Sequence, residues 1–127
     1  MLAPLALSIA LLGTACGGYN LQPTTESMQQ ELFETSCIYG PCHNSGDREG
    51  GLNLEADVAM AEMVGVLSDH SDLVRIQPGD HTLSFLYYKL SGELAADEGA
   101  IMPLGGRQLS ANELAVVAEW INSMPAE

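Results

Sequence analysis

The sequence predicts one small, mostly α-helical domain. The chain has 127 residues, which leaves room for a single domain. Apolar residues recur at helical spacing in several segments, and no alternation of apolar and polar residues persists long enough to predict a sheet. The sequence also contains no internal repeat. We therefore expect an all-α fold of three to five helices.

A first helix is expected over residues 26–37, which contain neither glycine nor proline. Met28 and Leu32 are four residues apart, and so are Phe33 and Cys37, which is the spacing of one helical face. The Gly-Pro pair that follows must end the helix. This helix therefore delivers an aromatic side chain and a cysteine to one side of the domain.

The middle of the chain is expected to hold a loop, a helix and a short extended segment. Residues 43–51 are polar and rich in glycine, which is typical of a loop. Residues 73–76 predict an extended piece that stops at a Pro-Gly pair. Residues 56–67 predict a second helix, with an apolar side made by Met60, Met63, Val64 and Leu67.

A third helix is expected to begin after Asp80 or Thr82, either of which can cap its first turn. Gly92 closes this helix. Residues 99–109 then form a loop that contains Met102 followed by a proline. The apolar face of the third helix is spaced at i, i+3, i+4 and i+7 and consists of Leu83, Leu86, Tyr87 and Leu90.

The last helix has the clearest signal in the chain. Ser110 and Glu113 form the Ser-x-x-Glu pattern of a capping box at its start. The apolar residues that follow share one helical face: Leu114, Val117, Ala118 and Ile121.

Two cysteines and a histidine stand close together: Cys37, Cys42 and His43. A Cys-x-x-Cys-His run is an attachment site for c-type haem, in which each thiol adds to a vinyl group and the histidine ligates the iron. This chain has four residues between its cysteines instead of two. The alternative is a plain Cys37–Cys42 disulfide. A zinc site would be strained, because Cys42 and His43 are adjacent and no fourth ligand is evident.

The N-terminus predicts an export signal. Residues 2–12 form an apolar run that is shorter than the roughly 20 residues of a membrane span and has the size of a signal-peptide core. Small residues followed by Cys16 resemble the lipobox of bacterial lipoproteins, in which the cysteine is lipidated. We therefore divide the chain into a signal peptide (1–15), a tether (16–25) and a domain (26–127). Secretion without lipid and a retained anchor are the alternatives.

The chain is strongly acidic. Seventeen acidic residues face four basic ones, which gives a formal net charge of −13. This charge repels a phosphate backbone and excludes binding to nucleic acid. It suits either steering toward a basic patch on a partner or simply a well-solvated surface.

These elements, taken in order, resemble a class I cytochrome c domain over residues 28–124, of the type found in exported bacterial proteins with a widened cysteine spacing. Such domains place an aromatic residue four positions before the first cysteine, as Phe33 is here. They carry a methionine ligand in the loop before the last helix, which Met102 matches, and an aromatic residue near the end of that helix, which Trp120 matches. The resemblance implies terminal helices that cross, and a small core that packs around a haem.

The resemblance implies a haem c attached to Cys37 and Cys42. His43 would be the proximal ligand of the iron and Met102 the distal one, which is the His/Met arrangement of cytochromes c. Two of the few basic residues, Arg75 and Lys89, are candidates either to pair with haem propionates or to form ordinary surface ion pairs. Other candidates for the distal position remain: Met60, Met63, His70 and His81.

The implied function is the transfer of single electrons by an exported protein, anchored by lipid on Cys16 in the periplasm or on the outer surface. The redox partner would carry a basic docking patch. No base or paired carboxylates accompany the cysteines, so we expect no enzyme activity. The alternative function is that of a haem-free lipoprotein with a cytochrome-like fold and a Cys37–Cys42 disulfide, acting as a binding or structural module.

Overall fold

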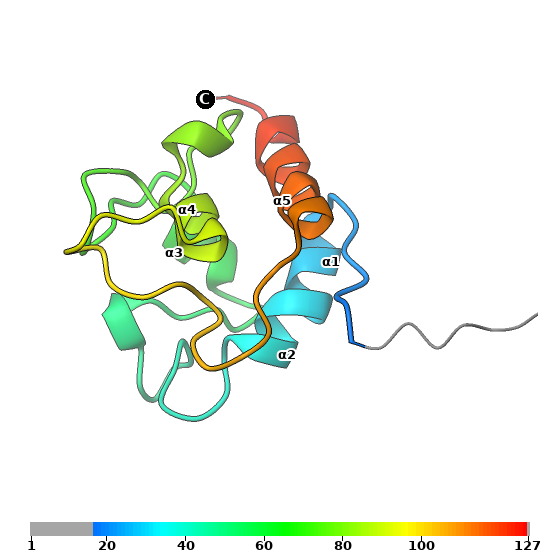
Figure 1. The fold of residues 1–127 in the computed structure, drawn as a ribbon. Coiled ribbons are helices and arrows are strands. Elements are labelled where there is room, and N and C mark those ends of the chain that lie inside the picture. The colour runs from blue at the N-terminus through cyan, green and yellow to red at the C-terminus, as the bar shows by residue number, and fades with distance from the viewer. Residues whose placement is uncertain (1–16, 127) are drawn as a thin grey trace, which may run out of the picture.

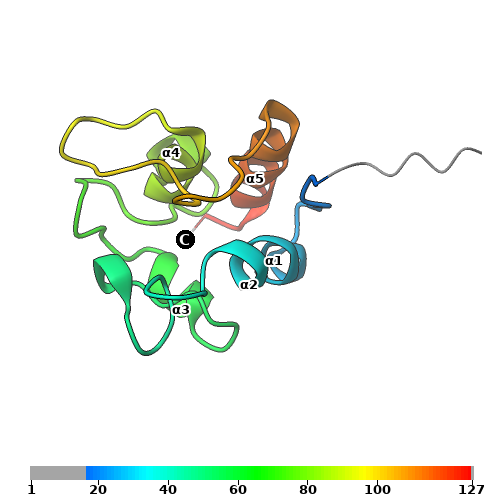
Figure 2. The ribbon, with the colours of Figure 1, turned by 60° about the horizontal axis from the view of Figure 1, so that its bottom comes forward.

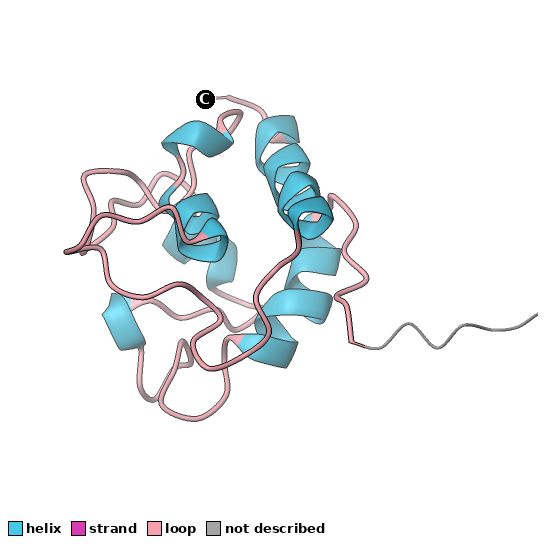
Figure 3. Ribbon diagram, viewed as in Figure 1, coloured by secondary structure: helices cyan, strands magenta, loops and turns pink. Residues whose placement is uncertain are grey.

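The computed structural model describes residues 17–126, so the expected signal peptide and Cys16 lie outside the described residues. Between residues 17 and 126 the chain forms helices and loops, with isolated bridges but no β-strand, which confirms the all-α prediction (Figure 1, Figure 3). None of the helices in this range is long and apolar enough to span a bilayer. In chain order the elements are α1 (Thr25–Ser27), η1 (Met28–Phe33), α2 (Glu34–Ser36), η2 (Glu49–Gly51), α3 (Ala59–Met63), η3 (His81–Leu83), α4 (Phe85–Ser91) and α5 (Ala111–Ser123).

The first three elements form one uninterrupted helix from residue 25 to residue 36, which confirms the first predicted helix. Thr24 caps it, because its hydroxyl oxygen accepts a hydrogen bond from the Ser27 N–H at 3.2 Å. The middle turn, η1, is a π-helix, which the residue spacing did not indicate. Its Leu32 and Phe33 side chains are buried in the core.

The second predicted helix is much shorter than expected. Instead of residues 56–67, only α3 is helical. Val64 leaves the helical conformation and forms a bridge with Ile76, whose N–H donates to the Met63 carbonyl at 3.0 Å. Gly65 then turns the chain with a positive φ of 68°. Pairing with the predicted extended segment, residues 73–76, therefore replaces the last turn of the expected helix.

The third predicted helix is divided into two parts. Asp80 caps only the short turn η3, and α4 begins after it at Phe85. Ser84 separates them and is fully buried; its hydroxyl accepts a hydrogen bond from the Gln77 N–H at 2.8 Å. Leu83, expected on the apolar face, is 49% exposed because it belongs to η3. Gly92 ends α4 in the left-handed conformation, as predicted.

The last helix, α5, begins with the predicted capping box. Its Trp120 packs edge-to-face against Phe33, with ring centroids 6.4 Å apart. The Trp120 indole N–H also donates to the Thr25 hydroxyl at 3.1 Å. The first and last helices therefore pack against each other, as both views of the ribbon show (Figure 1, Figure 2).

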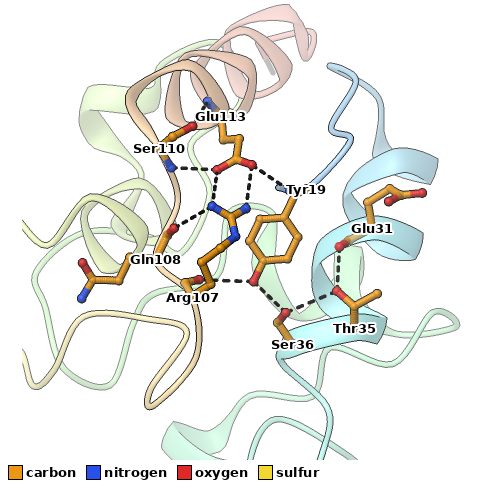
Figure 4. A network of polar contacts seen from close by, with 8 residues as sticks. All are labelled: Tyr19, Glu31, Thr35, Ser36, Arg107, Gln108, Ser110 and Glu113. Carbon is orange, nitrogen blue, oxygen red and sulfur yellow. Dashed lines mark hydrogen bonds and ion pairs between the residues drawn. The ribbon is translucent and has the colours of Figure 1, made fainter. Parts of the chain in front are cut away.

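The part of the expected tether that the structure describes is docked on the domain (Figure 4). The Tyr19 N–H donates to Glu113 of α5 at 2.8 Å, and Leu21 is buried in the core. The Arg107 guanidinium lies over the Tyr19 ring at 4.4 Å and forms an ion pair with Glu113 at 2.6 Å. Hydrogen bonds from Arg107, Ser110 and Tyr19 outweigh the effect of burial and lower the pKa of Glu113 to about 2.

Candidate functional site

One cleft collects the four residues that the sequence analysis singled out: Cys37, Cys42, His43 and Met102. The space between its walls is about 950 Å³, including the part open to solvent. Its lining residues include members of the His43 segment (residues 37–54) and of the Met102 loop (residues 92–110), which connects α4 to α5 (Figure 1).

Much of the cleft lining is apolar. The apolar lining residues include side chains from the first helix, the His43 segment and α4, together with the proline that follows Met102: Phe33, Leu52, Leu54, Phe85, Leu90 and Pro103. A largely apolar concavity with few polar groups is the usual form of a site for a flat organic cofactor.

Both cysteines of the cleft are free thiols, with no disulfide between them. Cys37 follows directly on the first helix, and its N–H donates to the Phe33 carbonyl at 2.9 Å. Burial, assisted by the nearby Cys42, raises the pKa of the Cys37 thiol to about 12, so this thiol is protonated.

The widened spacer between the cysteines forms a closed loop. The His43 N–H donates to the Cys37 carbonyl at 2.9 Å and brings the two ends of the spacer together. The Asn44 side-chain amide donates to the carbonyls of Ile38 and Gly40 at 3.0 and 2.8 Å. The sequence analysis missed Asn44; its only signal is that asparagine favours turns. These bonds leave the cysteines at both ends of the spacer beside the same cleft.

His43 has the protonation pattern of a metal ligand. Its Nδ1 lies 2.9 Å from the Glu49 carbonyl, which can only accept a hydrogen bond, so Nδ1 carries the proton and Nε2 keeps its lone pair. Burial lowers the pKa of His43, although the hydrogen bond to Glu49 opposes this effect. The imidazole is therefore neutral near pH 7 and has one nitrogen available for coordination.

The cleft reduces the number of candidates for a second iron ligand. Met63 is buried in the core, and neither it nor Met60 lines the cleft. His81 does not line the cleft either; its Nδ1 atom lies 3.1 Å from the Asn122 side-chain oxygen. Met102 and His70 are the candidates that do line it. His70 borders the turn η2, since a Cβ atom built on Gly50 would lie 3.9 Å from its Nε2.

Arg75 and Lys89 also line the cleft. The Arg75 side chain is 11% exposed, and its guanidinium donates to the carbonyls of Glu62 and Gly50 at 2.9 and 3.2 Å. Asp69 lies 3.8 Å from it, a looser contact. The Lys89 ammonium donates to two backbone carbonyls of the Met102 loop. Both cations thus bind backbone, an outcome that the sequence did not indicate.

Among residues 17–126, no group of three or more histidine, cysteine, aspartate or glutamate side chains is arranged to hold a metal ion. Comparisons with protein-family models, with curated proteins and with solved structures found no match for this chain. What the cleft binds must therefore be inferred from its own residues.

Proposed function

We propose that this chain is an exported c-type cytochrome domain that carries single electrons on one covalently attached haem. The observation that carries this proposal is that two thiols, a neutral imidazole and a thioether border one apolar cleft, although about sixty positions separate the first three from Met102 in the sequence. This donor set suits a c-type haem with His/Met ligation, and the apolar lining suits the face of a macrocycle.

The His43 segment would attach the cofactor and hold its iron. Cys37 and Cys42 would each add to a vinyl group, forming a sulfur–carbon bond while the thiol hydrogen goes to the neighbouring vinyl carbon. His43 would ligate through Nε2, because Nδ1 is held by the Glu49 carbonyl. When bound, the haem supplies a one-electron iron couple whose potential depends on its axial ligands.

Met102 would occupy the distal position. The proline after it disfavours helix at residue 102, so a loop rather than a helix sets the direction of its thioether. Its soft sulfur favours the reduced iron and raises the potential of a His-ligated haem. With His43 and Met102 both bound to the iron, small molecules would be kept from the metal, so the arrangement would favour electron transfer over oxygen chemistry.

Export and partner choice belong to the same proposal. Lipid on Cys16 would hold the domain at a bacterial membrane, in the periplasm or on the outer surface. The net charge of −13 would steer it toward a redox partner with a basic docking patch. The function is that of a carrier rather than an enzyme.

Covalent haem is the direct test. We expect the full chain, co-expressed with c-type cytochrome maturation proteins, to give a haem-stained band on a denaturing gel. The double variant Cys37→Ser/Cys42→Ser should give none, while Cys16→Ser, the matched control at the predicted lipidation site, should keep the stain but leave the membrane fraction. A haem-free wild-type band with a Cys37–Cys42 disulfide would contradict the proposal and favour the haem-free lipoprotein.

A further inference from the structure

The last turn of α4 holds the Met102 loop at three points, all through one residue. The Lys89 backbone carbonyl accepts a hydrogen bond from the Met102 N–H at 2.7 Å. The Lys89 ammonium donates to the carbonyls of Glu98 and Ala100 at 3.1 and 2.6 Å. The side chain thus binds the backbone just before Met102, while the main chain of the same residue binds Met102 itself.

Two glycines allow this close approach. Gly99, between the two carbonyls that bind the ammonium, has a φ of +82°, and a Cβ atom there would lie 3.2 Å from the Lys89 Nζ. Gly92 has a φ of +81°, and a Cβ atom there would lie 2.7 Å from the Ile101 Cδ1 atom. A side chain at Gly99 would crowd the Lys89 ammonium, and at either position it would have to adopt a positive φ that side chains rarely adopt.

The environment of the Lys89 ammonium keeps it on the loop. Burial lowers the pKa of Lys89, and the nearby Glu98 carboxylate opposes that effect. The Phe85 ring lies 5.9 Å below the ammonium. A partly buried ammonium needs acceptors for its protons, and the two loop carbonyls supply them. Opening the loop would remove these acceptors from the ammonium group, so the two hydrogen bonds stabilise the loop in its closed position against α4.

We propose that Lys89 is a positioning residue for Met102, holding residues 98–102 against α4 so that the thioether stays at the cleft. This inference rests on the proposed function, because it assigns Lys89 a role in keeping the distal iron ligand in place.

The first measurement is the rate of amide hydrogen exchange in the Met102 loop. It can be made on the protein with or without bound haem. Lys89→Met keeps an unbranched side chain but removes the N–H donors. The amide exchange rate over residues 98–104 should then rise about tenfold or more, because one hydrogen bond to a charged group changes the equilibrium between the closed and the open loop by about that factor. Lys89→Arg should restore part of the protection. Arg48→Gln, which removes an equal charge at the exposed Glu62 ion pair, should leave this segment unchanged. Unchanged exchange in Lys89→Met would overturn the proposal.

The second measurement is the methionine-to-iron charge-transfer band of the oxidised protein, followed as urea is raised. In Lys89→Met the band should disappear well before the helical circular dichroism, whereas in the wild type the two should disappear together. Loss of both at one midpoint in Lys89→Met would indicate a merely structural role and overturn the proposal. Gly99→Ala, which disturbs the ammonium site while keeping Lys89, should act in the same direction if Lys89→Met does not fold. A wild-type chain without covalent haem refutes the proposed function instead, and the exchange result then decides separately whether Lys89 holds the loop.

Discussion

The two sides of the cleft are held in different ways. The His43 segment is closed by hydrogen bonds within itself: the His43 N–H donates to Cys37, the Glu49 N–H to Cys42 and the Leu54 N–H to His43. The Met102 loop also has short-range hydrogen bonds, such as that from the Glu98 N–H to the Ala95 carbonyl at 3.1 Å, but groups outside it anchor its middle and its end.

On that side, Lys89 of α4 holds the middle of the loop, and Glu113 of α5 pairs with Arg107 near its end. Ser71 donates to the Glu98 carboxylate at 3.0 Å. The His43 segment is thus closed between its own residues, with Arg75 as a donor from outside, whereas the Met102 loop is anchored on α4 and α5. Removing a contact on one side should therefore have different consequences from removing one on the other.

The largest expected contrast comes from removing the proposed iron ligand on each side. His43→Ala should lose covalent haem altogether, because the histidine adjoins the attachment site. Met102→Ala should keep covalent haem but lose the charge-transfer band and bind added imidazole. Absorption spectra and haem-stained gels measure both results. Met60→Ala, a methionine outside the cleft, should leave the spectrum unchanged; an unaltered spectrum in Met102→Ala would instead indicate His70 as the distal ligand.

Trp120→Ala should destabilise both sides of the cleft at once, because the Trp120–Phe33 contact joins the first helix to α5. We expect a loss of about 3–5 kcal/mol in the free energy of unfolding, as for other large buried aromatic residues. Urea denaturation followed by circular dichroism measures it. Trp120→Phe, which loses the bond to Thr25 but keeps an aromatic ring, should cost only about 1 kcal/mol. A loss for Trp120→Ala no larger than this control would show that the contact contributes little.

Arg75→Met should loosen the His43 segment selectively. The variant leaves the Gly50 carbonyl without its donor, in the turn η2 whose Glu49 carbonyl orients His43. We expect a cost of about 2–3 kcal/mol and faster amide exchange over residues 49–52 but not over 98–104. Arg48→Met, at an exposed ion pair, is the control and should cost less than about 1 kcal/mol. Equal acceleration in both segments would mean that the two sides are not held separately.

Glu113→Gln should loosen the end of the Met102 loop and remove part of the acid sensitivity of the fold. The pKa of Glu113 is about 2 in the folded protein against an ordinary value of 4.5, so its stabilisation is complete above about pH 4.5 and is lost as the pH falls toward 2. We expect Gln to cost about 2 kcal/mol near pH 6, and the difference from wild type to shrink toward pH 2. Urea titrations across this range measure it. A difference that stays constant with pH would exclude the carboxylate as its source.

Local sequence was a good guide where local forces dominate. The capping box of α5, the glycine that ends α4 and the Gly-Pro break after the first helix all act within a few residues, and the first two were confirmed in detail. The Cys37–His43 spacing likewise placed these residues together at one cleft. The π-helical turn and the early end of α3 were missed, because packing and the Val64–Ile76 bridge compete there with helix propensity.

The sequence singled out four residues that line the cleft, but it did not indicate the hydrogen bonds that hold their segments in place. Nothing in the spacing marks Asn44 as the side chain that closes the cysteine spacer, or Arg75 and Lys89 as donors to backbone carbonyls. A long side chain reaches carbonyls that only the folded chain brings near, so its partners are invisible in the sequence.

The sequence by itself determined the helical class, the end of α4 and the start of α5, and it singled out four residues that line the cleft, because hydrophobic periodicity, caps and turn residues act over a few positions. Only the tertiary structure decided that Met102 and His70, rather than Met60, Met63 or His81, share a cleft with His43. It also decided that Tyr19 and Leu21 dock on the domain. These outcomes depend on contacts between distant segments, and the free energy of such contacts is set by burial and geometry that no local pattern specifies.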